Sequence, residues 1–368
     1  MTHLASLTLR GFKTIRDLSD FQLGQITILI GPNGAGKSNL LSFFRLLSRA
    51  LTPPDGLQIY VAEQGGASAL FHGGSGGTGE IATTLSFKTV DGEGSWALQL
   101  RHAAGDTLIV GSERNDIAGT GEWPPASLRG AATREPALIA LAETGNPTAR
   151  RLVETLRRAI VYHFLDTSPL SRIRNKWSID DGQWLKEDAG NLAAVLYRLH
   201  EAEPAYYRRI VETLRLVLPF FADFEFQPEF GKLLLRWRER GSDQIFGASQ
   251  AADGMLRAMA LVTLLQQPET DFPNVLILDE PELGLHPYAI EVLAALIQSA
   301  SQHCQVIVAT QSVSLIDRFE PHDIVVVDRN GRESGFRRLN DSDLAAWRED
   351  FTMSELWEKN VLGGRPAR

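Results

Sequence analysis

The spacing of apolar residues changes from strand-like to helix-like several times along the chain. In the first third, short apolar runs bounded by turn residues predict strands over 3–12, 25–31, 80–90, 95–103 and 106–113. Leu40, Phe43, Phe44 and Leu47 fall on one face of a helix that directly follows the second of these strands. The stretch over 53–79 is rich in Gly, Pro and Ser, and we expect it to be a mobile connection.

Beyond residue 135 the pattern becomes mainly helical and then alternates. Helical spacing dominates 135–220, in which 158–169 reads as one strand and its loop. After a strand pair over 224–240, helices and strands are expected over 254–265, 274–280, 288–300, 305–312 and 323–329. Continuously apolar strands that alternate with helices predict a parallel sheet buried on both faces. The sequence contains no repeats and no heptads long enough for a coiled-coil arm.

Composition and charge narrow the class of protein. With 368 residues and 43% hydrophobic content, the chain can form one large or two ordinary domains with a real core. The formal net charge of −8 means that any contact with nucleic acid needs a local basic patch. A single cysteine, Cys304, cannot form an internal disulfide, which fits a reducing compartment. No segment approaches the roughly 18 to 20 apolar residues of a membrane span, and no leader-like stretch opens the chain, so we expect a cytoplasmic protein that does not enter a membrane.

The turn between the second strand and the first helix carries a phosphate-binding motif. The pattern G-x-x-x-x-G-K-[S/T] is matched in full by Gly31, Pro32, Asn33, Gly34, Ala35, Gly36, Lys37 and Ser38. Glycines allow consecutive backbone N–H groups to point at one anion, and the following helix adds the positive end of its dipole. In such a loop Lys37 reaches the β- and γ-phosphates of ATP, and the Ser38 hydroxyl binds Mg²⁺. The alternative is a chance glycine turn, which the flanking strand and helix argue against.

A pair of acids would complete such a site. The apolar run that begins at residue 274 ends in Asp279 and Glu280. Open α/β sheets bind ligands at the carboxyl ends of their strands, so both acids would face the phosphate loop. Asp279 would hold Mg²⁺ through water, and Glu280 would polarise the attacking water. Either acid alone could be a solvated strand end.

Three segments together resemble the ABC-type ATPases of the RecF, SMC and OLD group, often called AAA family ATPases. They are GPNGAGKSN, LILDEPELGLHP and a helix start of the form Asp-Gly-x-Leu-Arg. The resemblance implies an α/β P-loop NTPase with an ABC-type ATPase head, a mixed sheet flanked by helices, and a helical insertion. The implied units are an N-terminal lobe over 1–130, the insertion over 131–222, a C-terminal lobe over 223–330 and a tail over 331–368.

In this family the Asp-Gly-x-Leu-Arg segment is the signature motif, which binds the γ-phosphate of the nucleotide held by the other subunit. Asp253, Gly254 and Arg257 occupy its positions in this sequence. The resemblance therefore implies a head-to-tail homodimer, or a higher oligomer, that forms on ATP. An ordinary amphipathic helix with Asp253 as its N-cap is the alternative.

Two positions depart from the family pattern. Ala252 stands where the family usually has Ser, so one hydroxyl contact with the γ-phosphate is missing or is replaced by Ser249 or Gln250. Gln311 stands where many relatives have a His that contacts the γ-phosphate. Glutamine can donate that hydrogen bond but carries no charge, so we expect slow turnover with binding intact.

Three other residues lie at motif positions that are less specific. His72, in LFHGG, falls where the family has its Q-loop, and it either senses Mg²⁺ or the γ-phosphate or is a loop histidine without a catalytic role. His286 would lie near the dimer seam. Asn39, next to Ser38, either touches nucleotide or caps and packs.

Two clusters interleave aromatic and basic side chains, as a surface for phosphate backbones does. They consist of Arg172, Arg174, Lys176 and Trp177, and of Arg236, Arg238 and Arg240. A solvated face or a half-exposed strand gives the same pattern, so DNA binding stays open.

The sequence thus predicts an ATP-hydrolysing switch. Only about 40 residues follow 323–329, too few for a nuclease domain, so a nuclease would be a separate effector chain. The ending FTMSELWEKNVLGGRP resembles small standalone bacterial ATPases encoded beside an effector, which favours the ATPase component of an anti-phage defence or DNA-maintenance system. The alternative is a RecF- or SMC-like DNA-binding repair ATPase. A transporter subunit ranks third, because PELGLHP differs from the transporter pattern.

Overall fold

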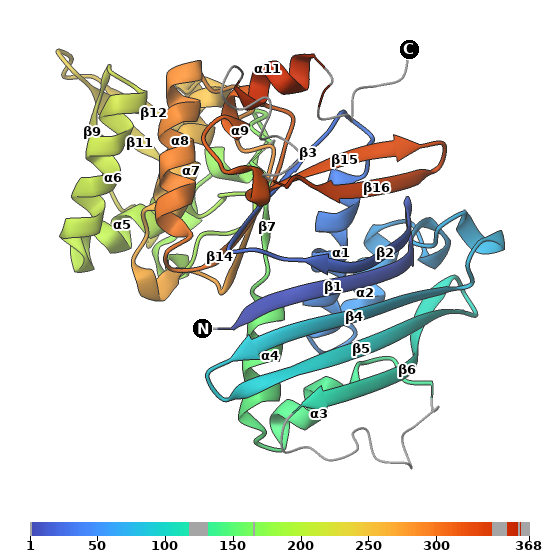
Figure 1. The fold of residues 1–368 in the computed structure, drawn as a ribbon. Coiled ribbons are helices and arrows are strands. Elements are labelled where there is room, and N and C mark those ends of the chain that lie inside the picture. The colour runs from blue at the N-terminus through green and yellow to red at the C-terminus, as the bar shows by residue number, and fades with distance from the viewer. Residues whose placement is uncertain (1, 118–131, 165, 341–351, 360, 362–368) are drawn as a thin grey trace.

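The computed structural model describes residues 2–117, 132–164, 166–340, 352–359 and 361. Two large sheets dominate these residues (Figure 1). The first is antiparallel, with the strand order β2-β1-β4-β5-β6. Its strands are β1 (His3–Phe12), β2 (Ile15–Gln22), β4 (Glu80–Thr89), β5 (Gly92–Ala103) and β6 (Thr107–Ile117).

The second sheet is mixed and has the order β16-β15-β3-β14-β13-β7. Its strands are β3 (Ile26–Ile30), β7 (Val161–Tyr162), β13 (Val275–Asp279), β14 (Gln305–Thr310), β15 (Ile324–Asn330) and β16 (Glu333–Arg338). All neighbours pair in parallel except β15 and β16, which form an antiparallel hairpin. The α/β fold with a mixed sheet, expected from the sequence, is therefore confirmed.

Helices cover both faces of this mixed sheet. The longer ones are α1 (Lys37–Ala50), α2 (Gly56–Glu63), α4 (Pro147–Arg157), α5 (Leu192–Ala202), α6 (Pro204–Val217), α7 (Asp253–Leu265) and α8 (Pro287–Ala300). Shorter ones are α3 (Ala137–Glu143), α9 (Val313–Ile316) and α11 (Met353–Glu358). Small strands lie beside α5 and α6: β8 (Trp177–Ser178), β9 (Phe221–Phe224), β10 (Lys232–Leu233), β11 (Arg236–Glu239) and β12 (Ile245–Gly247). In the described part of the chain, no helix is both long and apolar enough to span a bilayer.

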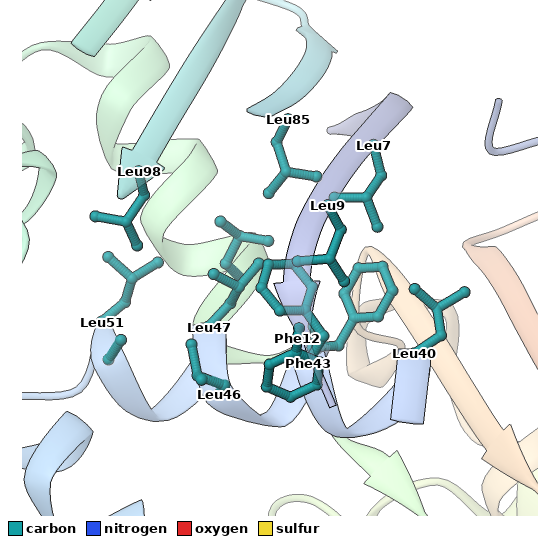
Figure 2. Close-up of a cluster of buried hydrophobic side chains, with 14 of the residues drawn as sticks. Leu7, Leu9, Phe12, Leu40, Phe43, Leu46, Leu47, Leu51, Leu85 and Leu98 are labelled. Atoms are coloured by element: carbon teal, nitrogen blue, oxygen red, sulfur yellow. The ribbon is translucent and has the colours of Figure 1, made fainter. Parts of the chain in front are cut away.

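Alternation along the buried strands divides the interior into two cores. Leu29 of β3 points to one core, whereas its neighbours Ile28 and Ile30 point to the other, as the two-residue period of a strand requires. The first core also contains α1 to α4 and the antiparallel sheet. The second contains α5 to α8. Figure 2 shows part of the first core, where leucines and phenylalanines of α1 pack against β1, β4 and β5.

The segment over 53–79 differs from the mobile connection expected from its composition. It contains α2 and two short 3₁₀ turns. Leu57 and Tyr60 are buried against α1, and the Tyr60 hydroxyl is 2.7 Å from Ser42 Oγ. The glycines and prolines of this segment therefore separate short ordered elements, whose few apolar residues are enough to fix them to the core.

Residues 131–222, expected as an insertion, contribute to both cores. Helix α4 packs on α1 in the first core, and α5 and α6 belong to the second. Strand β7 pairs with β13 at the edge of the mixed sheet. The unit boundaries proposed from the resemblance stay a prediction.

Candidate nucleotide site

The loop between β3 and α1 is shaped by glycines and supported by the β15–β16 hairpin. Gly36, at φ +118°, packs so closely that a Cβ atom there would lie 2.0 Å from Ser334 Oγ. The same Ser334 hydroxyl donates to the Ala35 carbonyl at 2.6 Å, and Arg329 donates to the Gly34 carbonyl at 3.1 Å. These contacts satisfy the carbonyls of Gly34 and Ala35, and the Ala35 N–H donates to the Pro32 carbonyl at 3.2 Å. The other N–H groups of the loop can turn toward an anion.

Lys37 begins α1 and folds back over the loop. Its ammonium donates to the carbonyls of Gly31 at 2.5 Å and Pro32 at 3.1 Å. Burial lowers the pKa of Lys37, while the carboxylates of Glu280 and Asp279 nearby act in the opposite direction. A cation that is held by two neutral carbonyls can transfer its hydrogen bonds to phosphate oxygens when they are present.

Ser38 and Asp279 bring oxygen ligands together. The Ser38 hydroxyl lies 3.4 Å from Asp279 Oδ1, at the carboxyl end of β13. Burial raises the pKa of the Asp279 carboxyl, because a charged carboxylate is poorly solvated there. A hydroxyl and a carboxylate are the donors that Mg²⁺ prefers, and Mg²⁺ usually takes its other ligands from phosphates and water. Consistently, the described residues contain no group of three or more His, Cys, Asp or Glu that could hold a metal alone.

Glu280 and Gln311 are in direct contact. Gln311, which follows β14, donates from its side-chain amide to the Glu280 carboxylate. The backbone of Glu280 has φ +48°, a costly conformation for a residue with a side chain, and its N–H donates to the Ala309 carbonyl at 2.8 Å. Such conformations concentrate at functional sites. The base proposed from the sequence and the residue at the switch position therefore lie side by side.

Glu282 is a neighbouring acid that sequence reasoning did not single out. Its Oε1 accepts hydrogen bonds from the Thr310 hydroxyl at 2.6 Å and from the Gln311 backbone N–H at 3.1 Å. Burial raises the pKa of Glu282. Its other oxygen, Oε2, is buried without a partner among the described residues. The third acid in the run DEPE was the available signal, and its carboxylate fixes the backbone from which Gln311 projects.

The signature segment lies at the start of α7. Ala252 is the N-cap residue, is exposed, and gives α7 no side-chain cap. Gly254 packs against the loop after β13, where a Cβ would come within 2.4 Å of the Gly284 carbonyl oxygen. Arg257 donates to the carbonyls of Phe164 at 2.9 Å and Leu283 at 3.1 Å. Only glycine fits at position 254, because a larger residue would clash with Gly284 of the same chain.

Arg174, from one of the basic clusters, holds the signature segment in place. Its guanidinium donates to Asp253 Oδ1 at 3.0 Å, to the Ala251 carbonyl at 3.1 Å and to the Ala248 carbonyl. Its Nε also donates to the Thr167 carbonyl at 2.8 Å, and its side chain is only 9% exposed. Sequence reasoning counted Arg174 among surface cations, but the structure makes it an internal support of the signature.

The other basic residues of the two clusters mostly meet acids. Arg172 lies 3.1 Å from Asp188, and Arg238 lies 2.8 Å from Glu225. Lys176 and Arg236 both contact Glu229. Their charge is thus partly neutralised, which weakens the interpretation of these clusters as a surface for a phosphate backbone.

The histidines differ in their surroundings. His72 donates from Nδ1 to the Lys13 carbonyl, on the β1–β2 turn, at 2.8 Å. His286 caps α8 by accepting from the Tyr288 N–H at 3.3 Å. His163, which sequence reasoning missed, follows β7 and lies beside Asp279, because Tyr162 pairs with Leu278. Burial lowers the pKa of His163, and the nearby Asp279 carboxylate opposes that shift.

Asn39 donates from its side-chain amide to Thr14 Oγ1 at 2.7 Å. Gln250, considered as a replacement for the missing signature hydroxyl, accepts from the Gly247 N–H at 2.9 Å. In this structure each of these amides holds a local backbone or side chain. Their contact with nucleotide stays a prediction, as does that of Asn33 and of His72.

The fold and the loop geometry define an ABC-type P-loop ATPase domain of the RecF and SMC kind. Residues 26–116 and 147–317 match the family described as "AAA domain, putative AbiEii toxin, Type IV TA system", and the chain belongs to that family. No curated protein matches the sequence.

Several solved structures share the fold at low identity. An SmcHead bound to the C-winged helix domain of ScpA is 17% identical with a TM-score of 0.62, over 94% of this chain and 99% of that one. An Smc head domain with a coiled coil and joint from Pyrococcus yayanosii is 13% identical with a TM-score of 0.57, over 98% and 100%. An Smc head with an extended coiled coil bound to the C-terminal domain of ScpA, from Pyrococcus furiosus, is 14% identical with a TM-score of 0.56, over 95% and 99%.

The structures named for coiled coils raise the question of an arm in this chain. Its longest helices in the described ranges, α1, α6 and α8, have 14 residues each. At about 1.5 Å per residue, 14 residues span about 21 Å, far less than an arm. The described part of the chain thus contains no helix of coiled-coil length, and the sequence contains no long heptad pattern.

Proposed function

We propose that this protein is an ATP-hydrolysing switch whose two copies close head to tail around ATP. The phosphate loop over 31–38 and Lys37 would bind the phosphates, and Ser38 and Asp279 would hold Mg²⁺. The metal would neutralise charge that develops on the transferred phosphoryl group. Glu280 would polarise the attacking water, and Gln311 would orient Glu280 and the γ-phosphate.

One observation carries the dimeric form of this proposal. In the described chain, no hydrogen bond or ion pair joins Asp253 or Gly254 to residues 31–39. The exposed start of α7 is nevertheless held in a defined conformation by Arg174 and by the close contact with Gly284. A helix N-terminus is suited to bind a phosphate. The phosphate bound by a second copy is the partner that this segment would meet.

The first test mixes two inactive variants. Ala252→Glu places a negative charge at the exposed start of α7 without the internal clash of any change at Gly254, and Ala252→Gln is its uncharged control. Lys37→Ala disables the phosphate loop. A mixed dimer has one site with an intact loop facing an intact signature, so mixing should restore part of the ATPase activity. If tagged copies of the two variants co-purify and no activity returns, the signature acts within one subunit and the composite site is wrong.

The second test traps the closed state. Glu280→Gln keeps the shape of the side chain but is a poor base, so ATP should bind and persist. Light scattering at micromolar protein should then show a dimer with ATP and a monomer with ADP. A monomer in both conditions would contradict closure driven by ATP.

We further propose that the protein serves as the ATPase component of a bacterial defence or DNA-maintenance system, with a separate effector such as a nuclease. The family description, which names a toxin–antitoxin system, supports this role. The alternative is a DNA-binding repair ATPase of RecF or SMC type, which the SMC-head fold favours. ATPase rates with and without duplex DNA separate the two, because only the second role requires direct stimulation by DNA.

A further inference from the structure

A groove of about 590 Å³ runs along α1 at the β7 edge of the mixed sheet. Its walls come from α1, from α2 (which packs on α1), from residues 157–163 and from residues 186–188. Helices α1, α2 and α4 lie close together on this side of the molecule (Figure 1). We call this cavity the α1 groove. Its volume falls in the range of sites that take small molecules.

Cations are concentrated in the α1 groove. Its basic lining residues are Arg45, Arg49, Arg157, Arg172 and Lys186. Its acidic lining residues are Glu63, Glu187 and Asp188. The chain as a whole has a formal net charge of −8, so a cavity in which bases outnumber acids runs against the overall charge. A locally positive cavity attracts anions.

Two of these cations have hydrogen-bond donors that the protein does not use. Arg45 donates from Nη2 to the Val161 carbonyl at 3.3 Å, but its buried Nε has no partner among the described residues. Arg49 is exposed, and its guanidinium forms no hydrogen bond or ion pair with any described residue. By contrast, Lys186 lies 2.6 Å from Asp181. Because the Nε of Arg45 is shielded from solvent, a ligand in the groove would accept hydrogen bonds from the terminal guanidinium nitrogens instead.

The spacing of Arg45 and Arg49 favours phosphate as the ligand. Arg45 and Arg49 are four residues apart on α1, so they lie on one face of the helix. Two guanidinium groups on one helix face can donate together to the several oxygens of a phosphate group, whereas a carboxylate offers only two oxygens. Arg157, which also lines the groove and donates from Nε to the Leu51 carbonyl at the end of α1, keeps its other nitrogens available for a second phosphate.

The α1 groove is separate from the candidate nucleotide site but shares its supports. Arg45 follows Lys37 by eight residues of α1, about 12 Å along the helix axis, although its charge still opposes the rise that burial causes in the pKa of Asp279. His163 lines the groove and also lies beside Asp279 at the end of β7. A ligand in the groove would therefore contact both α1, which carries Lys37, and the strand next to Asp279.

We propose that the α1 groove binds a phosphate-bearing ligand of nucleotide size through Arg45 and Arg49, at a second site distinct from the phosphate loop. The shared chemistry is a pair of neighbouring phosphates. It is found in a free nucleotide or pyrophosphate compound and in a short nucleic-acid strand.

The test uses the full chain with Lys37→Ala, so that the phosphate loop does not contribute. Inorganic pyrophosphate is titrated by calorimetry, and a fluorescein-labelled strand of ten deoxythymidines is titrated by anisotropy, both without ATP. We expect at least one probe to bind, and Arg49→Glu in the same background to weaken it by about tenfold or more. Binding of pyrophosphate identifies a free phosphate compound, whereas binding of the strand alone identifies nucleic acid.

Arg208→Glu is the matched control, because Arg208 is an exposed arginine on α6 outside the groove. Arg45→Gln is a second variant that removes the groove-facing charge while keeping a hydrogen-bond donor. The proposal is overturned if neither probe binds, or if both groove variants bind as tightly as the Arg208→Glu control. Because no reading depends on hydrolysis or dimer formation, this result is independent of the mixing experiment.

Discussion

The phosphate loop and the signature segment both present backbone N–H groups, but they are built in opposite ways. The loop over 31–38 is contiguous, and the groups proposed to bind phosphate are its own backbone together with Lys37. The start of α7 depends on a distant side chain, because Arg174, 79 residues earlier, holds Asp253. Damage to the loop should therefore abolish binding, whereas damage to the support of the signature should weaken only the steps that need a second copy.

The largest effect is expected for Lys37→Ala. Two charge-assisted hydrogen bonds to phosphate, at about 1.5–3 kcal/mol each, should disappear, so ATP affinity should fall by about a hundredfold or more. Calorimetry with ATP and Mg²⁺ measures this, and the thermal unfolding temperature should stay close to that of the wild type. Unchanged affinity would show that the loop is not the nucleotide site.

A smaller effect, on dimer formation rather than on ATP binding, is expected for Arg174→Ala. The variant loses the contact with Asp253 and leaves carbonyls at 248 and 251 without their donor. ATP-dependent dimer formation should weaken by about tenfold, while the ATP affinity of the monomer changes by less than about twofold. Arg174→Lys keeps the charge but not the planar guanidinium group, so its ATP-dependent dimer formation should be intermediate between that of Arg174→Ala and that of the wild type.

The proposed difference between the phosphate loop and the signature segment is wrong if Arg174→Ala loses ATP affinity as severely as Lys37→Ala. The thermal unfolding temperature, measured on the same samples, distinguishes a local effect on the signature from a general loss of folding. Arg172→Ala is the neighbouring control, since Arg172 pairs with Asp188 and does not contact the signature.

Glu282→Gln tests the acid that links β13 to β14 and should have a modest effect that depends on pH. Burial raises the pKa of Glu282 in the folded state, so its charged form costs stability at pH values above that pKa. The variant should therefore be more stable than the wild type at pH 8, and the difference should shrink as pH falls through the folded pKa and the wild-type carboxyl becomes protonated. A difference that grows toward acid pH would contradict this sign.

The smallest effect is expected for Ala252→Ser. Helix α7 has no side-chain N-cap, and a serine at this position would supply one, worth about 1 kcal/mol. Denaturant unfolding measures the gain. The same hydroxyl is the one that the family usually directs at the γ-phosphate, so hydrolysis should rise as well. A gain in stability without any gain in hydrolysis would separate the capping role from the catalytic one.

The same contrast explains what could be predicted from the sequence. The placement of the glycine loop between β3 and α1, and of Asp279 and Glu280 at the end of β13, follows from short contiguous patterns; their chemical roles stay a prediction. Arg174, Glu282 and His163 act through contacts made only in the folded chain, and each looked like an ordinary surface or loop residue. Helix α2 was not predicted, because the surrounding Gly and Pro residues indicate a loop and only a few apolar residues of the helix are buried.

The β15–β16 hairpin that supports the phosphate loop has a consequence for protein synthesis. Residues 34 and 35 leave the ribosome before their donors, Arg329 and Ser334, which follow 295 and 299 residues later. At about 5–20 residues per second, that delay is roughly 15 to 60 seconds. A nascent chain therefore exposes an unfinished loop throughout this interval, and a product truncated before residue 329 lacks both donors. Only a chain that extends through residue 334 can assemble the loop in its final form.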